Sequence, residues 1–173
     1  MNGYFAVCLT EFYQHQYMKF LLENYKQLAL PYPFPVALSF LASPVMLGAD
    51  NGLTILCFND DDEVVGAIGA LHGTGEHQYE DTHILQIQTV LLLEHYRKTR
   101  LLLRSFQFLL QYLEQSNKQV AEIRFWVPGN AEYKRLLLKV AELTQTAGSL
   151  DEYRASLSAW QSYATKFRQE VYF

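Results

Sequence analysis

Hydrophobic residues form their longest dense run between Ile84 and Leu93, where Gln86 and Gln88 lie two apart on one pleat face. A strand this apolar is typical of a position covered on both faces, so we predict a central strand. A basic turn follows, from Tyr96 to Arg100. A long amphipathic helix comes next, because apolar residues then recur at helical spacing: Leu102, Phe106, Leu109, Leu110 and Leu113.

The first third of the chain predicts one strand and two helices. Tyr4–Thr10 is aromatic and β-branched enough for a strand, and Glu11–Ala29 carries apolar residues at helical spacing. Prolines at positions 31, 33 and 35 end that helix. Val36–Leu41 is predicted as a short second helix that ends before Pro44.

A β-hairpin is the clearest local feature. Two strand-like runs, Leu53–Phe58 and Val64–Leu71, flank the acidic turn 59–63. The spacing of the acidic side chains does not fit a calcium-binding loop, so the turn is predicted to be solvated.

The last third predicts a strand over Ala121–Val127 and a helix over Ala131–Leu143, with Asn130 as its N-cap. Two alternatives remain open afterwards. Either a hairpin turns around Gly148 and a closing helix covers 157–170, or a single helix covers 149–170. The order of elements indicates an α/β (α+β) fold with a mixed sheet, in one domain spanning residues 1–173.

Composition narrows the classes of function. The 173 residues are 50% hydrophobic and carry a net charge of −4, which argues against a dedicated nucleic-acid binder. No apolar run is long enough to cross a membrane, and the first residues do not resemble a signal peptide, so we expect a cytoplasmic protein without a membrane partner. Cys8 and Cys57 lie in apolar segments and are predicted to be buried, reduced thiols.

The most polar loop runs from His72 to Thr82. Its Glu76 and His77 are candidates for a general base that deprotonates an amine. A metal site is an alternative, but the spacing matches no established ligand pattern, and we predict no metal. An exposed hairpin loop explains the same residues without any chemistry.

The strand, basic turn and helix resemble the central motif of the GNAT superfamily of N-acetyltransferases. In that family a strand leads into Arg/Gln-x-x-Gly-x-Gly/Ala, which opens a helix and holds the coenzyme A pyrophosphate. Here Leu92 to Arg97 resembles the approach, and Arg97 matches the first position. Arg100 and Leu102 stand where the family has small residues, and a side chain there obstructs a close approach of phosphate to backbone.

The resemblance implies a GNAT-like, mostly antiparallel mixed sheet flanked by helices, and it implies acetyl-CoA as co-substrate. It also implies a set of cofactor-binding residues. Backbone groups near Leu91 and Leu92 would hold the pantetheine arm, an Asn such as Asn130 would contact the coenzyme, and the pyrophosphate would lie against Arg97, Lys98, Thr99, Arg100, Leu101 and Leu102. The proline-rich segment 30–35 resembles a loop that lines the acceptor cleft in the family, and a rigid turn packed on the core is the alternative.

The resemblance also implies a catalytic tyrosine that protonates the leaving thiolate. Leu136 or Leu137 occupies that position, and Tyr133 is the nearest phenol. The implied function is N-acetylation of a small-molecule or peptide amine. The alternative is a non-catalytic GNAT-like module for binding or assembly, for example a homodimer formed through the aromatic C-terminal helix. An unrelated α/β domain is a third reading of the same pattern.

Overall fold

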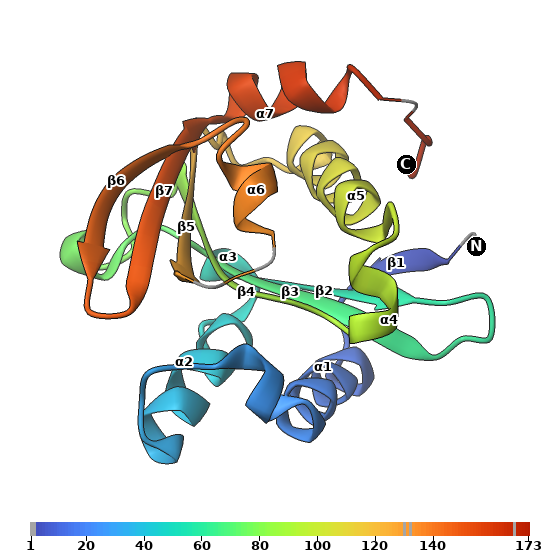
Figure 1. The fold of residues 1–173 in the computed structure, drawn as a ribbon. Helices are drawn as coiled ribbons and strands as arrows, with labels where there is room; N and C mark the ends of the chain where they lie inside the picture. Colours follow the sequence, from blue (N-terminus) through green and yellow to red (C-terminus); the bar gives the residue numbers. More distant parts are fainter. Residues whose placement is uncertain (1–2, 130, 132, 168) are drawn as a thin grey trace.

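In the computed structural model, which describes residues 3–129, 131, 133–167 and 169–173, the described strands form one seven-stranded sheet in the order β1-β2-β3-β4-β5-β7-β6 (Figure 1). β4 (Ile84–Leu92) lies in the middle and pairs in parallel with β5, while every other neighbouring pair is antiparallel. The predicted central strand and the mixed, mostly antiparallel sheet are therefore confirmed. The other strands are β1 Tyr4–Val7, β2 Gly52–Phe58, β3 Val64–His72, β5 Glu122–Pro128, β6 Glu142–Ala147 and β7 Leu150–Ser156.

Helices cover both faces of this sheet. α1 (Glu11–Glu23) and α2 (Phe34–Met46) pack on one face, and α5 (Leu101–Gln115) and α7 (Leu157–Ala164) pack on the other (Figure 1). The remaining helices are short: η1 Tyr25–Leu28, α3 Gly48–Asn51, η2 Gly75–His77, α4 Glu94–Arg97 and α6 Lys134–Leu137.

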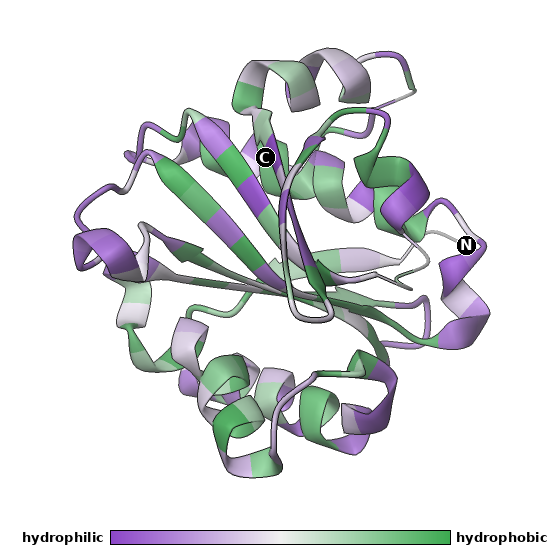
Figure 2. Ribbon diagram, turned by 60° about the vertical axis from the view of Figure 1, so that its left-hand side comes forward, coloured by the Kyte–Doolittle hydropathy of each residue, from purple (hydrophilic) through white to green (hydrophobic). Residues whose placement is uncertain are grey.

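Two hydrophobic cores follow from the alternation of side chains along the strands. In β2, Ile55 and Cys57 join the core under α5, whereas Leu56 and Phe58 join the core under α1 and α2. Figure 2 shows hydrophobic residues along the strands and the helices that flank them. Cys57 and Cys8 are buried and not joined in a disulfide, as predicted.

A β-bulge interrupts β4 at its midpoint. Gly69 of β3 opposes Thr89 and the next residue, Ala70, opposes Ile87, so Gln88 is the extra residue. Leu85 and Ile87 face the α5 core before the bulge, and Leu92 faces it afterwards. The bulge therefore shifts the alternation by one residue and re-aims the second half of β4.

The predicted second helix was wrong at both ends, because α2 runs from Phe34 through Pro44 to Met46. Pro35 lies in the first turn, where a backbone N–H has no helical partner in any case. Pro44 leaves the carbonyl of Phe40 without its helical donor, and the Ser43 hydroxyl donates to that carbonyl at 2.7 Å. The helix therefore tolerates its internal proline.

The predicted helix over 131–143 was also wrong. Among the described residues of that range α6 alone is helical, and Glu142–Ala147 forms β6, an exposed edge strand paired with β7. Of the two alternatives for the following segment, the hairpin is correct, and Gly148 turns it with a φ of 62°. The single helix over 149–170 is wrong, and the closing helix α7 begins at Leu157 after its N-cap Ser156.

Smaller corrections concern element ends. The first strand stops at Val7, and the first helix stops at Glu23 before the separate turn η1. Tyr96 and Arg97, which were predicted in a turn, belong to the short helix α4. The hairpin over β2 and β3 is confirmed.

Candidate functional site

The candidate site lies where two parallel strands separate. β4 and β5 pair from Ile84 to Ile87 and from Glu122 to Phe125, and beyond these residues no pairing links the two strands in the described chain. The strands diverge, and residues of their second halves, Gln88–Leu92 in β4 with Trp126 and Pro128 in β5, line a cavity of about 460 Å³. A cavity of this size accommodates a small ligand or the reactive arm of a larger one.

The backbone edge of β4 is open to this cavity. On its other edge Leu91 and Leu92 pair with Ala67 and Gly66 of β3. On the other side the pairing with β5 has already ended, so backbone N–H and C=O groups on that edge of β4 can bind water or a ligand. A ligand that contains amide groups can hydrogen-bond along such an edge as an added strand does.

Three other segments close the cavity. Residues 28–30 and Phe40 of α2 form the wall on the α1–α2 side, and Leu102 of α5 contributes from the opposite side. The segment around α6 covers the gap between the strands, through Ala131, Tyr133, Arg135 and Leu136.

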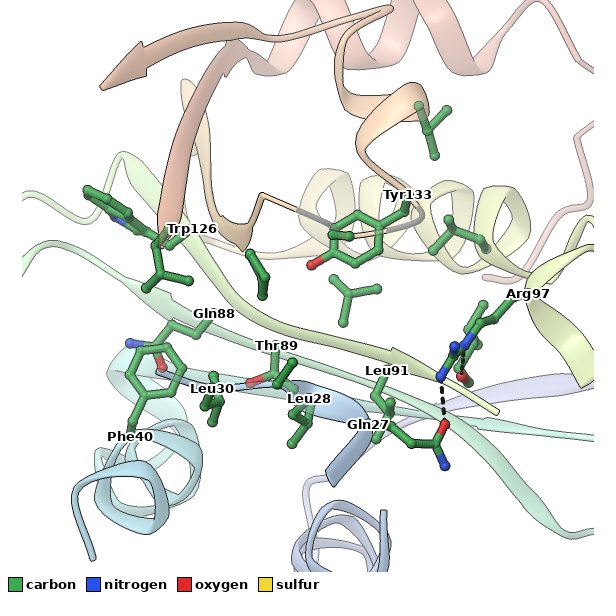
Figure 3. Close-up of a pocket in the computed structure, with 18 of the residues that line it drawn as sticks. Gln27, Leu28, Leu30, Phe40, Gln88, Thr89, Leu91, Arg97, Trp126 and Tyr133 are labelled. Atoms are coloured by element: carbon green, nitrogen blue, oxygen red, sulfur yellow. Dashed lines mark hydrogen bonds between the residues drawn. The ribbon is translucent and has the colours of Figure 1, made fainter. Parts of the chain in front are cut away.

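The two ends of the cavity differ in chemistry (Figure 3). Phe40, Gln88 and Trp126 lie at one end, which is aromatic. Arg97 lies at the other, where its Nε donates to the carbonyl of Leu92 at 2.8 Å and a terminal nitrogen donates to Gln27 Oε1 at 2.6 Å. The guanidinium group of Arg97, a residue of α4, therefore joins the C-terminal end of β4 to η1 at the cationic end of the cavity.

Tyr133 lies between the two ends, with its ring directed into the gap between the strands (Figure 3). Burial raises the pKa of its hydroxyl above the usual value of a tyrosine. The group is therefore protonated at neutral pH, as an ordinary tyrosine also is.

The structure brings together part of the predicted site. Leu91, Leu92, Arg97, Leu102 and Tyr133 all line the cavity. Other predicted residues line a separate hollow of about 50 Å³ beside Arg104: Thr99, Arg100 and Leu101. Lys98 is exposed between α4 and α5, and Asn130 lies outside the described residues.

Glu76 and His77 lie elsewhere. They belong to η2 in the loop before β4, at the end of that strand opposite Arg97, and they do not line the cavity. His77 Nδ1 lies 3.0 Å from Thr74 Oγ1 and 3.3 Å from Asp81 Oδ2. Burial works to raise the pKa of Asp81, but hydrogen bonds from Thr74 outweigh it and lower that pKa. These contacts order the loop.

Two further findings concern membranes and metals. Among the described residues, no helix combines the length and the apolar character that a bilayer crossing needs. The same residues include no cluster of three His, Cys, Asp or Glu side chains arranged to hold a metal ion.

Comparison with known proteins rests on structure. No protein-family model matches the sequence, and no curated protein matches it. Among solved structures, PaiA N-acetyltransferase from Thermoplasma acidophilum, solved in complex with coenzyme A, is 13% identical. The match has a TM-score of 0.61 and covers 90% of this chain and 99% of that one. This chain has the GNAT fold.

Other GNAT structures agree. An acetyltransferase of the GNAT family from Staphylococcus aureus Mu50 is 11% identical with a TM-score of 0.63, over 89% of this chain and 99% of that one. FdhC, a nucleotide-linked sugar GNAT, is 15% identical with a TM-score of 0.64, and the match covers 96% of this chain and 94% of that one. At such identities the likeness establishes the fold alone.

Sequence reasoning missed several residues that line the cavity. Phe40, Trp126 and Gln27 each lie in segments predicted for other reasons. Gln88 could have been found from the sequence, because a polar residue in an otherwise apolar strand indicates a side chain that faces a cavity. Of the proline-rich segment 30–35, Leu30 alone appears among the described lining residues.

Proposed function

We propose that this chain is an acyl-CoA-dependent N-acetyltransferase, which transfers the acetyl group of acetyl-CoA to an amine. The observation that supports this most is the separation of β4 and β5, which leaves an open backbone edge that leads to Arg97. The pantetheine arm of coenzyme A contains amide groups that suit such an edge, and its pyrophosphate suits a cationic end. A GNAT-fold neighbour was solved with coenzyme A bound.

In this proposal the phosphates lie at the junction of α4 and α5. Arg97, Lys98 and Arg100 supply positive charge, and the N-terminus of the fifteen-residue α5 supplies the backbone N–H groups of Arg100 and Leu102. The N–H groups of Thr99 and Leu101 already donate to the Tyr96 carbonyl and to Thr99 Oγ1. The side chains of Arg100 and Leu102 replace the small residues of the family motif. The phosphates are therefore held more by side-chain charge than by close contact with backbone.

The proposed reaction uses the open strand edge and Tyr133. Backbone groups near Leu91 and Leu92 hold the thioester, and the amine nitrogen attacks its carbonyl carbon. A C–N bond forms, the C–S bond breaks, and the Tyr133 hydroxyl gives its proton to the departing thiolate, after which water returns a proton to Tyr133. Among the described lining residues there is no carboxylate or imidazole, so water accepts the proton of the amine. Glu76 and His77 receive no role.

Titration calorimetry with acetyl-CoA tests this function. We expect binding that weakens as salt increases, because exposed charges are screened. Arg97→Glu should weaken binding by at least about tenfold, since it reverses a charge at the proposed phosphate site. Lys166→Glu makes the same change of charge beyond α7, and it should leave the affinity within about twofold of wild type.

Tyr133→Phe separates binding from chemistry in the same experiment. It should bind acetyl-CoA normally and lose at least about tenfold in turnover, because only the proton donor is removed. Failure of the folded wild-type protein to bind acetyl-CoA at high concentration would overturn the proposal. The chain would then be a GNAT-shaped binding module.

A further inference from the structure

The end of the cavity distant from Arg97 has an apolar, aromatic lining. Phe40 of α2 and Trp126 of β5 lie on opposite walls, with the Gln88 side chain between them (Figure 3). Leu30 and Leu150 line the same cavity. Aromatic walls of this kind bind flat or branched apolar groups through burial and stacking.

One polar group is fixed at this end. Ser43 Oγ lies 3.0 Å from Gln88 Oε1 and 2.7 Å from the Phe40 carbonyl, so its one proton is shared between these two acceptors and the contact holds the amide beside the aromatic walls. An amide oxygen has a second lone pair, so Gln88 can still accept a hydrogen bond from an amine. Gln88 provides this acceptor without adding a charge.

The charges around the cavity disfavour a ligand with several positive charges. The charged side chains among the described lining residues are Arg97 and Arg135. Glu152 lies opposite Trp126 in the sheet, but its carboxylate is buried and already bonded to Arg154, to Thr144 at 2.8 Å and to Gln145 at 3.1 Å. A polyamine entering here would lose water without gaining a carboxylate partner, which is costly for each charge.

We infer that the acceptor is a primary amine carried on an aromatic or branched apolar group, with no second positive charge. The inference rests on the proposed function and adds the substrate class. The apolar group lies between Phe40 and Trp126, and the amine points along β4 toward the thioester. A GNAT-fold neighbour from Vibrio cholerae is a spermidine N-acetyltransferase, and the cavity of this chain favours a different class of acceptor.

Steady-state kinetics with two amines test the inference. With saturating acetyl-CoA, phenylethylamine should react with a kcat/KM at least about tenfold above that of spermidine. Trp126→Ala should raise the KM for phenylethylamine by at least about tenfold, because it removes one aromatic wall, and it should leave the affinity for acetyl-CoA unchanged. A preference for spermidine would overturn the inference.

A binding measurement without cofactor separates this inference from the proposed function. The chain has two tryptophans, and Trp160 is buried in the core. In Trp160→Phe, fluorescence therefore reports on Trp126, and phenylethylamine should quench it while spermidine should not. Quenching without any binding of acetyl-CoA would reject the proposed function and keep the aromatic amine site. Binding of acetyl-CoA without quenching, and without acetylation of phenylethylamine, would reject the inference and keep the function.

Discussion

A single histidine gives the fold a dependence on pH. His72, the last residue of β3, is 3% exposed. Burial, and then the positive charge of Lys118, lowers the pKa of His72 to about 4, although a hydrogen bond with the backbone of Thr82 acts in the opposite direction. The folded protein therefore holds a neutral imidazole where an unfolded chain would be protonated at mildly acidic pH.

The sign of the effect follows from proton binding. Between the unfolded pKa of 6.5 and the folded pKa of about 4 the unfolded chain binds the extra proton, so stability falls as pH falls through this window. The loss from His72 reaches at most about 3 kcal/mol. Urea unfolding at several pH values should show that His72→Gln loses this part of the pH dependence. His15→Gln, at an exposed position, should retain it, and equal pH profiles for all three proteins would contradict the assignment.

At the scale of elements, α1 fits against the sheet through one glycine. The hydroxyl of the fully buried Tyr17 lies where a Cβ on Gly69 would be, 2.0 Å from that position. Gly69 is also the β3 residue at the β4 bulge. Packing of α1 and the altered course of β4 therefore meet at this point.

Gly69→Ala should consequently destabilise the protein. The added methyl group collides with the phenol of Tyr17, which is enclosed on all sides, and overpacking of this kind costs about 1–3 kcal/mol. Urea unfolding measures the change. Gly75→Ala is the matched control, because its new methyl group would meet only the Tyr79 hydroxyl at 3.7 Å, and its stability should stay near that of wild type. Similar stabilities for both variants would show that α1 adjusts without cost.

The sequence predicts elements whose pattern is local. The apolar run of β4 and the helical spacing of α5 identified the centre of the sheet and the helix beside it. The first two residues of β6, Glu142 and Leu143, were predicted as the end of a helix, because β6 is an exposed edge strand and its pairing with β7 determines its conformation. The residues of the candidate site fall into the same two groups, those with a local sequence signal and those without one. Arg97 and Leu91 came from a continuous motif, whereas Phe40 and Trp126 share a cavity because two strands diverge, which no local spacing records.

At the scale of the molecule, the two ends of the chain pack together on α5 (Figure 1). Tyr172 contacts the rings of Phe5 in β1 and Phe108 in α5, with centroids 5.6 and 5.4 Å away. Arg104 of α5 donates to the carbonyl of Gly3 at 3.0 Å and to Glu170 at 2.8 Å. In α7, Trp160 packs into the core of its own chain, so that aromatic residue does not face a partner. The homodimer stays a prediction.

This arrangement separates stability from ligand binding. A chain ending at Phe167 loses the contacts of Tyr172 and Glu170, and it exposes Phe5 and Phe108. Its free energy of unfolding should fall by about 1–3 kcal/mol, from lost apolar burial and ring contacts. None of these residues lines the cavity, so the affinity for acetyl-CoA should remain within about twofold of the full chain. Val171→Ala is the control for the tail, because Val171 is 87% exposed and should change neither quantity. The prediction would be contradicted by a truncated chain that keeps the free energy of unfolding of the full chain but no longer binds acetyl-CoA. The cavity would then depend on the far side of α5.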